Sequence, residues 1–212
     1  YLQKENADTS LIRLIKNDLY PEMVRATAIS YLSAFNTPAA DSVIKEMLYN
    51  LEPLVRERAI DAFNPNSTQE LVQVIFPLLN DPIRMVRIAA ASKLSSLGKE
   101  FFTDEQMKKL NEVLDEYLKT LEYTADFPSG KFNLGNFYSN KGDYLKAESY
   151  YINAIKMDDR FYPAKSNLAM LYYNQGTLNE AENLIRDLII NHSEYTEGEY
   201  YLGLLYAEQQ RY

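Results

Sequence analysis

The stretch MVRATAISYL (residues 23–32) recurs as LVRERAIDAF (54–63) and again as MVRIAAASKL (85–94). Each copy contains a Val-Arg pair, and successive pairs are 31 residues apart. In every copy, Ala follows Val after four residues and a large apolar residue follows it after eight. These spacings place the side chains on one face of a helix. The copies therefore predict three equivalent helices that pack through their Val, Ala and Leu or Phe positions.

A second apolar segment precedes each copy, at residues 11–15, 43–48 and 71–79. Proline stands in or beside each intervening turn, where its missing N–H costs least, as Pro21, Pro53 and Pro82. Each pair of segments therefore predicts a helix hairpin with one solvent-exposed face. Such a hairpin cannot bury its apolar face alone, so we expect the hairpins to stack on one another.

The first 100 residues resemble HEAT-like repeats, in the short form that bilin-lyase-type proteins also contain. The resemblance rests on the pattern Asp-Pro-x-x-x-Val-Arg-x-x-Ala, best preserved at Asp81, Pro82, Val86, Arg87 and Ala90. It implies hairpins at about 8–36, 38–65 and 67–98 within a segment 1–100. It also implies that the three repeated arginines bond to acidic groups in adjacent turns, the alternative being an anion-binding stripe: Arg25, Arg56 and Arg87. A bilin-lyase activity is not favoured.

The period changes to 34 residues in the second half of the chain. Leucine recurs at 134, 168 and 202, a small residue follows each of them, and tyrosine recurs at 138, 172 and 206. Glycine recurs at 142 and 176, where a turn between helices suits it. This pattern resembles tetratricopeptide repeats over 128–212, with units at 128–161, 162–195 and a partial unit at 196–212. The two resemblances together imply an all-α fold, a right-handed α-solenoid of stacked hairpins.

Residues 101–127 join the two arrays. Thr103 and Gln106 form a capping-box pattern, and apolar residues follow at helical spacing. Tyr117 lies 34 residues before Tyr151, in register with the second helix of a repeat unit. We therefore expect one connecting helix that ends the first array and begins the second, so that the arrays share a core.

Composition restricts the classes of function. The chain has 212 residues, no cysteine and a net charge of −8. Residues 1–100 hold 11 basic and 12 acidic groups, whereas residues 101–212 hold 11 and 18. Binding to nucleic acid or to anionic membrane requires clustered Lys and Arg, so neither is expected. No apolar run is long enough for membrane insertion.

The sequence contains no recognisable catalytic or metal site. His192 is the only histidine, and a lone histidine forms neither a catalytic triad nor a zinc site. None of the seven glycines forms a phosphate-binding loop. We therefore predict a non-enzyme that holds no cofactor or metal in this segment.

The tetratricopeptide resemblance also implies a concave groove that holds a peptide or a partner helix. Counted along the repeat frame, eight residues face this groove: Phe132, Asn136, Ser139, Ser166, Met170, Tyr173, Tyr200 and Leu204. Tyr and Met are enriched in protein interfaces. The predicted function is a protein-interaction scaffold with a protein or peptide partner. The alternative is that this face packs against the rest of a longer chain.

The order of the two repeat types resembles the C-terminal half of bacterial multihaem c-type cytochrome proteins that end in tetratricopeptide repeats. This resemblance implies a docking or assembly role in a periplasmic electron-transfer protein, with haem held only by an upstream region; otherwise a cytoplasmic protein is expected. The first residues lack a methionine and the third repeat stops at Tyr212 after one helix. Either the native chain continues or another molecule covers that face, and we expect continuation.

Overall fold

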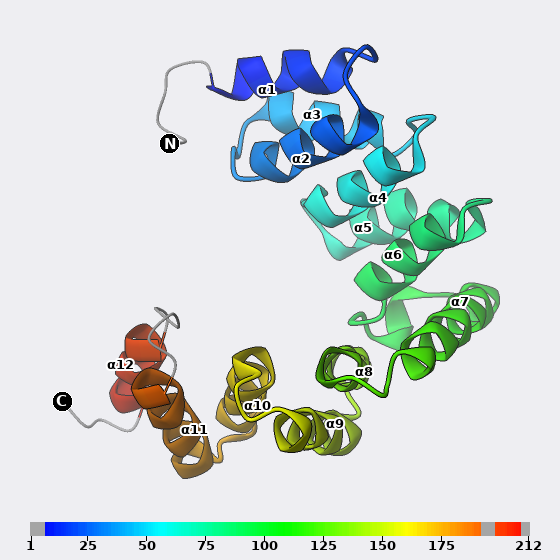
Figure 1. The fold of residues 1–212 in the computed structure, drawn as a ribbon. Helices are drawn as coiled ribbons and strands as arrows, with labels where there is room; N and C mark the ends of the chain where they lie inside the picture. The colour runs from blue at the N-terminus through cyan, green and yellow to red at the C-terminus, as the bar shows by residue number, and fades with distance from the viewer. Residues whose placement is uncertain (1–6, 192–197, 209–212) are drawn as a thin grey trace. The chain divides into compact units, whose positions relative to one another are not determined.

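The computed structural model describes residues 7–191 and 198–208, and every regular element in these ranges is helical. The prediction of an all-α fold is therefore confirmed for the described part of the chain (Figure 1). The elements run in the order α1 (Ala7–Lys16), α2 (Glu22–Leu32), α3 (Pro38–Met47), α4 (Pro53–Ala62), α5 (Thr68–Ile75), η1 (Phe76–Asn80), α6 (Arg84–Leu94), η2 (Lys99–Phe101), α7 (Asp104–Tyr123), α8 (Pro128–Asn140), α9 (Tyr144–Met157), α10 (Tyr162–Gln175), α11 (Leu178–Asn191) and α12 (Gly198–Glu208).

The chain divides into two compact units, Tyr1–Tyr117 and Leu118–Tyr212. In unit 1, α2 packs on α1 and on α4, and α4 packs on α6. In unit 2, each helix from α9 to α12 packs on the one before it, as the ribbon shows (Figure 1). Consecutive packing of this kind confirms a solenoid-type architecture within each unit.

The predicted connecting helix is α7, which begins with the predicted capping box. The Thr103 N–H donates to Oε1 of Gln106 over 2.9 Å, and the Gln106 N–H donates to Oγ1 of Thr103 over 3.2 Å. The division between the two units falls inside this helix, between Tyr117 and Leu118. The shared core of the two arrays stays a prediction.

The repeated Val and Ala positions form the core of unit 1 with one exception. Val55, Ala59, Val86 and Ala90 are fully buried, but Val24 is 40% exposed. The prediction that Val24 is a core residue is therefore wrong. The reason is its place in the array: α4 and α6 each pack on an earlier second helix of a hairpin, whereas the structure describes none before α2.

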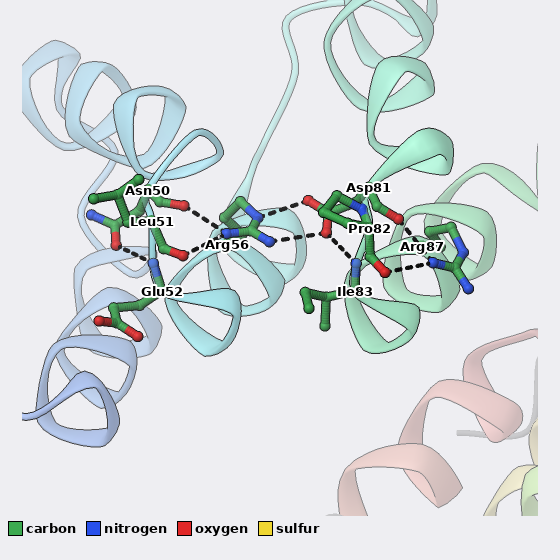
Figure 2. Close-up of polar contacts among 8 residues, drawn as sticks. All are labelled: Asn50, Leu51, Glu52, Arg56, Asp81, Pro82, Ile83 and Arg87. Atoms are coloured by element: carbon green, nitrogen blue, oxygen red, sulfur yellow. Dashed lines mark hydrogen bonds and ion pairs between the residues drawn. The ribbon is translucent and has the colours of Figure 1, made fainter.

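Arg56 links the second hairpin to the third (Figure 2). Its Nε and Nη2 donate to the two carboxylate oxygens of Asp81 over 2.8 and 2.9 Å. Its Nη1 donates to the carbonyls of Asn50 and Leu51 over 2.7 and 2.9 Å, in the turn before its own helix. The Arg56 and Asp81 side chains are only 11% and 7% exposed. The largely buried Arg56 guanidinium therefore hydrogen-bonds to acceptors in two turns of the array.

The other two repeated arginines make related contacts. Arg87 donates to the Asp81 carbonyl over 2.9 Å and to Oε1 of Glu116 over 2.7 Å. Arg25 donates to the Ile15 carbonyl and pairs with Asp18, each over 2.8 Å. All three arginines therefore bond to acidic groups, as predicted, but only the acid of Arg56 lies in a turn of the next hairpin, and that of Arg87 lies within α7. The acid of Arg25 lies in its own hairpin, and the uncharged Asn50 stands 31 residues before Asp81.

The small residue after each repeat leucine works as predicted in the first unit of the second array. A Cβ on Gly135 would lie 2.5 Å from the Tyr151 ring, so glycine is what lets α8 approach α9. Gly142 and Gly176 adopt positive φ values of 75° and 79°, as expected for the turns between helices. The glycines of the 34-residue pattern thus have two roles: Gly135 allows the close contact between α8 and α9, and Gly142 and Gly176 adopt the turn conformation.

A second contact repeats with the same period and was not predicted. The Tyr172 hydroxyl donates to Oε1 of Glu148 over 2.7 Å, and the Tyr206 hydroxyl donates to Oε1 of Glu182 over 3.2 Å. Each bond joins the first helix of one repeat to the second helix of the repeat before. Burial and then the bond to Glu148 raise the pKa of Tyr172 to about 12. The tyrosine positions therefore provide polar links between repeats as well as packing area.

Candidate functional site

A pocket of about 310 Å³ lies among α8, α9 and α10. We call it the amide pocket, and it is lined by Ser139, Tyr144, Tyr151, Asn167, Met170, Leu171, Asn174 and Gln175. Its volume is at the lower end of the range typical of ligand sites, about 300–1,000 Å³. It can therefore hold a short part of a larger ligand.

A hydrogen-bond network fixes the polar groups at the floor of the amide pocket. Oδ1 of Asn136 accepts from the Tyr151 hydroxyl over 2.8 Å and from Nδ2 of Asn167 over 2.7 Å. The two donors determine which end of the Asn136 amide faces them. Asn167 donates through its Nδ2, so its Oδ1 is the acceptor end of the same amide. Side chains from all three helices are thus held in register.

The eight residues that line the amide pocket include no Asp, Glu, Lys, Arg or His. Burial raises the pKa of the Tyr151 hydroxyl above its usual value. The polar groups of Ser139, Asn167, Asn174 and Gln175 include both donors and acceptors. The pocket thus offers paired hydrogen-bonding capacity without charge.

A smaller apolar hollow of about 20 Å³ lies beside the amide pocket, among α10, α11 and α12. Its lining residues are Met170, Tyr173, Ile185, Tyr201 and Leu204. Met170 lines both spaces, so the amide pocket and the apolar hollow adjoin along α10.

The structure brings together four of the eight predicted groove residues. Ser139 and Met170 line the amide pocket, and Met170, Tyr173 and Leu204 line the apolar hollow. Asn136 lies behind the amide pocket and positions two lining side chains, Tyr151 and Asn167.

The other three predicted residues line neither space. Phe132 is half-buried, and its ring packs edge-on against Phe161 with centroids 5.5 Å apart. Ser166 is half-buried on α10. Tyr200 is 66% exposed, and its ring contacts that of Tyr201 with centroids 5.6 Å apart.

Sequence reasoning missed the amides of the pocket. Asn167 and Asn174 lie three residues before and four residues after Met170, which places all three on one face of α10. Tracing that spacing from the predicted Met170 would have found them. Tyr144 and Gln175 carry no such signal, since both lie at helix ends next to a turn.

A broader depression of about 560 Å³ lies in unit 1 at the end of α1. It is lined by Ile12, Arg13, Lys16, Asn17, Asp18 and Leu19. Lys16 and Asp18 already pair with Glu46 and Arg25, respectively. Two of its three charged groups are therefore already paired within unit 1.

Over residues 7–191 and 198–208, no cluster of three or more His, Cys, Asp or Glu side chains could hold a metal ion. In the same ranges no helix is both long and apolar enough to cross a membrane. His192 lies outside the described residues, as does Ser193.

Comparison with known proteins identifies one repeat family. Residues 164–190, within α10 and α11, match the model of the tetratricopeptide repeat. The chain is also 26% identical over 145 residues to a DNA ligase of Mesomycoplasma hyopneumoniae, an alignment that covers 63% of this chain. The chain spans 20% of the length of that relative.

The repeat match confirms the predicted tetratricopeptide resemblance for residues 164–190 and indicates a protein-interaction scaffold. Folds of this type are typically non-catalytic, and the partial similarity to a ligase does not decide the question. Neither match is to a HEAT-like protein or to a cytochrome, so those resemblances stay predictions.

Proposed function

We propose that unit 2 is a non-catalytic module that captures an extended segment of a partner protein across the amide pocket and the apolar hollow. The observation that carries the proposal is the alignment of the two spaces along α10, within the segment that matches the tetratricopeptide repeat. A segment that crosses both would place polar backbone in one and an apolar side chain in the other. Solenoids use extended surfaces of this kind for binding.

The chemistry of this surface favours a protein segment as the partner over nucleic acid or a lipid membrane. Unit 2 contains most of the acidic half of the chain, which disfavours nucleic acid and anionic lipid. Aromatic and methionine side chains at the apolar hollow are the types enriched at the centres of protein interfaces. The partner would therefore be a protein segment.

Replacing Tyr173 and Tyr200 together with Ala is expected to lower the amount of partner that the intact chain captures from its native source by about tenfold or more. Tyr173 lines the apolar hollow, and Tyr200 is an exposed ring at the start of α12. The change at Tyr173 removes aromatic area from the apolar hollow, and the change at Tyr200 removes the ring that contacts Tyr201 of that hollow. Neither change removes a fully buried side chain. Capture is measured by quantitative mass spectrometry of the co-eluting proteins.

The matched control is the double change of Tyr31 and Tyr49 to Ala in unit 1, where the rings are 58% and 66% exposed. Capture by this control is expected to equal that by the unchanged chain. Far-ultraviolet circular dichroism checks that both variants keep their helices. Undiminished capture by the Tyr173/Tyr200 variant would refute the groove assignment.

The cytochrome-docking alternative rests on the order of the repeats in the sequence. It is tested by the native sequence before Tyr1, where Cys-x-x-Cys-His motifs would support it and their absence would remove it. A scaffold in that setting would still use the same surface of unit 2.

A further inference from the structure

The amide pocket combines three features that bear on what it binds. Its floor is held by the bonds from Tyr151 and Asn167 to Asn136, so its polar groups are fixed before a ligand arrives. Its lining residues carry no charge. Met170 and Leu171 provide an apolar wall beside the amides. The pocket is thus neutral, preorganised and able to donate and accept hydrogen bonds.

These features discriminate against charged ligands. An ion that enters a neutral pocket loses hydration and gains no opposite charge, which costs free energy. An amide loses less hydration and finds both an acceptor and donors, so its hydrogen bonds with water are replaced. A neutral pocket of this kind therefore separates ligands by charge even when their shapes are the same.

We infer that the amide pocket takes an uncharged stretch of peptide backbone from the interior of the partner's segment, and excludes a chain terminus or a charged side chain. This inference deepens the proposed function and rests on it. Side-chain amides of the pocket pair with backbone amides of the ligand, each group acting as both donor and acceptor. Asn167 supplies an oriented acceptor because Asn136 holds its Nδ2.

The position of the pocket agrees with an internal stretch. The amide pocket adjoins the apolar hollow through Met170, so a segment that lies in the pocket continues over α10 towards Tyr173 and Leu204. A terminus placed in the pocket would bring a carboxylate or an ammonium group into neutral surroundings. The backbone stretch avoids this cost.

The test uses three small probes that share one skeleton: N-acetyl-alanine-N-methylamide, which is neutral, N-acetyl-alanine, which is an anion, and alanine-N-methylamide, which is a cation at neutral pH. Each is titrated into the intact chain, and the side-chain amide resonances of Asn167 and Asn174 are followed by nuclear magnetic resonance. The neutral probe is expected to shift both resonances, and the charged probes to bind at least about tenfold more weakly. Equal shifts with all three probes, or shifts only outside the pocket, would overturn the inference.

Two variants with the same change of charge sharpen the test. Asn174→Asp adds a carboxylate to the amide pocket and is expected to reverse the preference towards the cationic probe. Asn133→Asp adds the same charge on α8 at an exposed residue that does not line the pocket, and is expected to leave the preference unchanged. Equal effects of the two variants would show that net charge, and not the pocket, sets the selectivity, and would also overturn the inference.

The outcomes separate this inference from the proposed function. If the Tyr173/Tyr200 variant loses capture but the probes show no charge selectivity, the capture surface stands and the backbone assignment fails. If the probes show the expected selectivity but the Tyr173/Tyr200 variant captures its partner normally, the capture proposal fails.

Discussion

Arg56→Met is expected to lower the free energy of unfolding of unit 1 by about 3–5 kcal/mol. The change removes the partner of Asp81, whose side chain is 7% exposed, and two donors to the carbonyls of Asn50 and Leu51. A buried carboxylate without a counter-charge is among the most destabilising defects in a folded protein. Urea unfolding followed by circular dichroism measures the effect.

The control is Arg13→Met, which removes the same side chain from an exposed position on α1. It is expected to change the free energy of unfolding by about 0.5 kcal/mol or less. A loss at Arg56 no larger than that at Arg13 would contradict the view that the repeated arginines connect the hairpins. The double change of Arg56 and Asp81 to apolar residues should recover part of the loss, because it leaves no unpaired charge.

Gly130→Ala is expected to destabilise unit 2 by about 3 kcal/mol. A Cβ at this position would lie 1.8 Å from the carbonyl oxygen of Thr124 and 2.4 Å from its carbonyl carbon. Backbone atoms cannot turn aside as a flexible side chain can, so α8 must move away from the turn that precedes it. Hydrogen exchange read by mass spectrometry should show faster exchange in α8 and α9, with unit 1 unchanged.

Gly203→Ala is the control, since Gly203 also lies in the first helix of a repeat but has no atom close to the position of an added Cβ. A Cβ there meets nothing within 4 Å, so the only effect is the higher helix propensity of alanine, worth up to about 1 kcal/mol. The variant is expected to be as stable as the unchanged chain or more stable. If Gly130→Ala behaves in the same way, the close approach at Thr124 is wrong.

The hairpins could be predicted from the sequence because their signals are local and periodic. Val55, Ala59, Val86 and Ala90 are buried where the 31-residue spacing places them. The same spacing failed at Val24, since burial also depends on a neighbouring hairpin, and the periodicity of one helix does not report whether that neighbour is present.

The polar contacts between hairpins show a second limit of prediction from the sequence. The pattern identified Arg56 and Asp81 as motif positions, and their pairing follows from the stacking. The pairs of Tyr172 with Glu148 and of Tyr206 with Glu182 obey the same 34-residue period, yet they were missed. A repeat pattern is recognised mainly from its apolar positions. These bonds instead join a half-buried tyrosine hydroxyl to an acidic side chain on the neighbouring helix, so the pattern does not reveal them.

The sequence pointed to some of the residues that line the amide pocket and the apolar hollow. The repeat frame located Ser139, Met170, Tyr173 and Leu204, because it fixes which face of α8, α10 and α12 they occupy. Phe132, another predicted groove residue, packs against the rings of Phe161 and Tyr151 and lines neither space. Which side chains line a pocket depends on rotamers and on contacts between helices, and helical spacing alone does not contain that information.

Photo-crosslinking tests the central claim most directly, namely that unit 2 holds its partner along α10. A benzoylphenylalanine replaces Tyr173 at the apolar hollow in one variant and Tyr123, an exposed tyrosine that is 90% accessible, in another. After irradiation in the native source, the variant at 173 is expected to crosslink to one uncharged internal segment of a partner protein, and the variant at 123 to give no such product. Equal crosslinking from both positions, or none from 173 while the partner still co-purifies, would contradict the account.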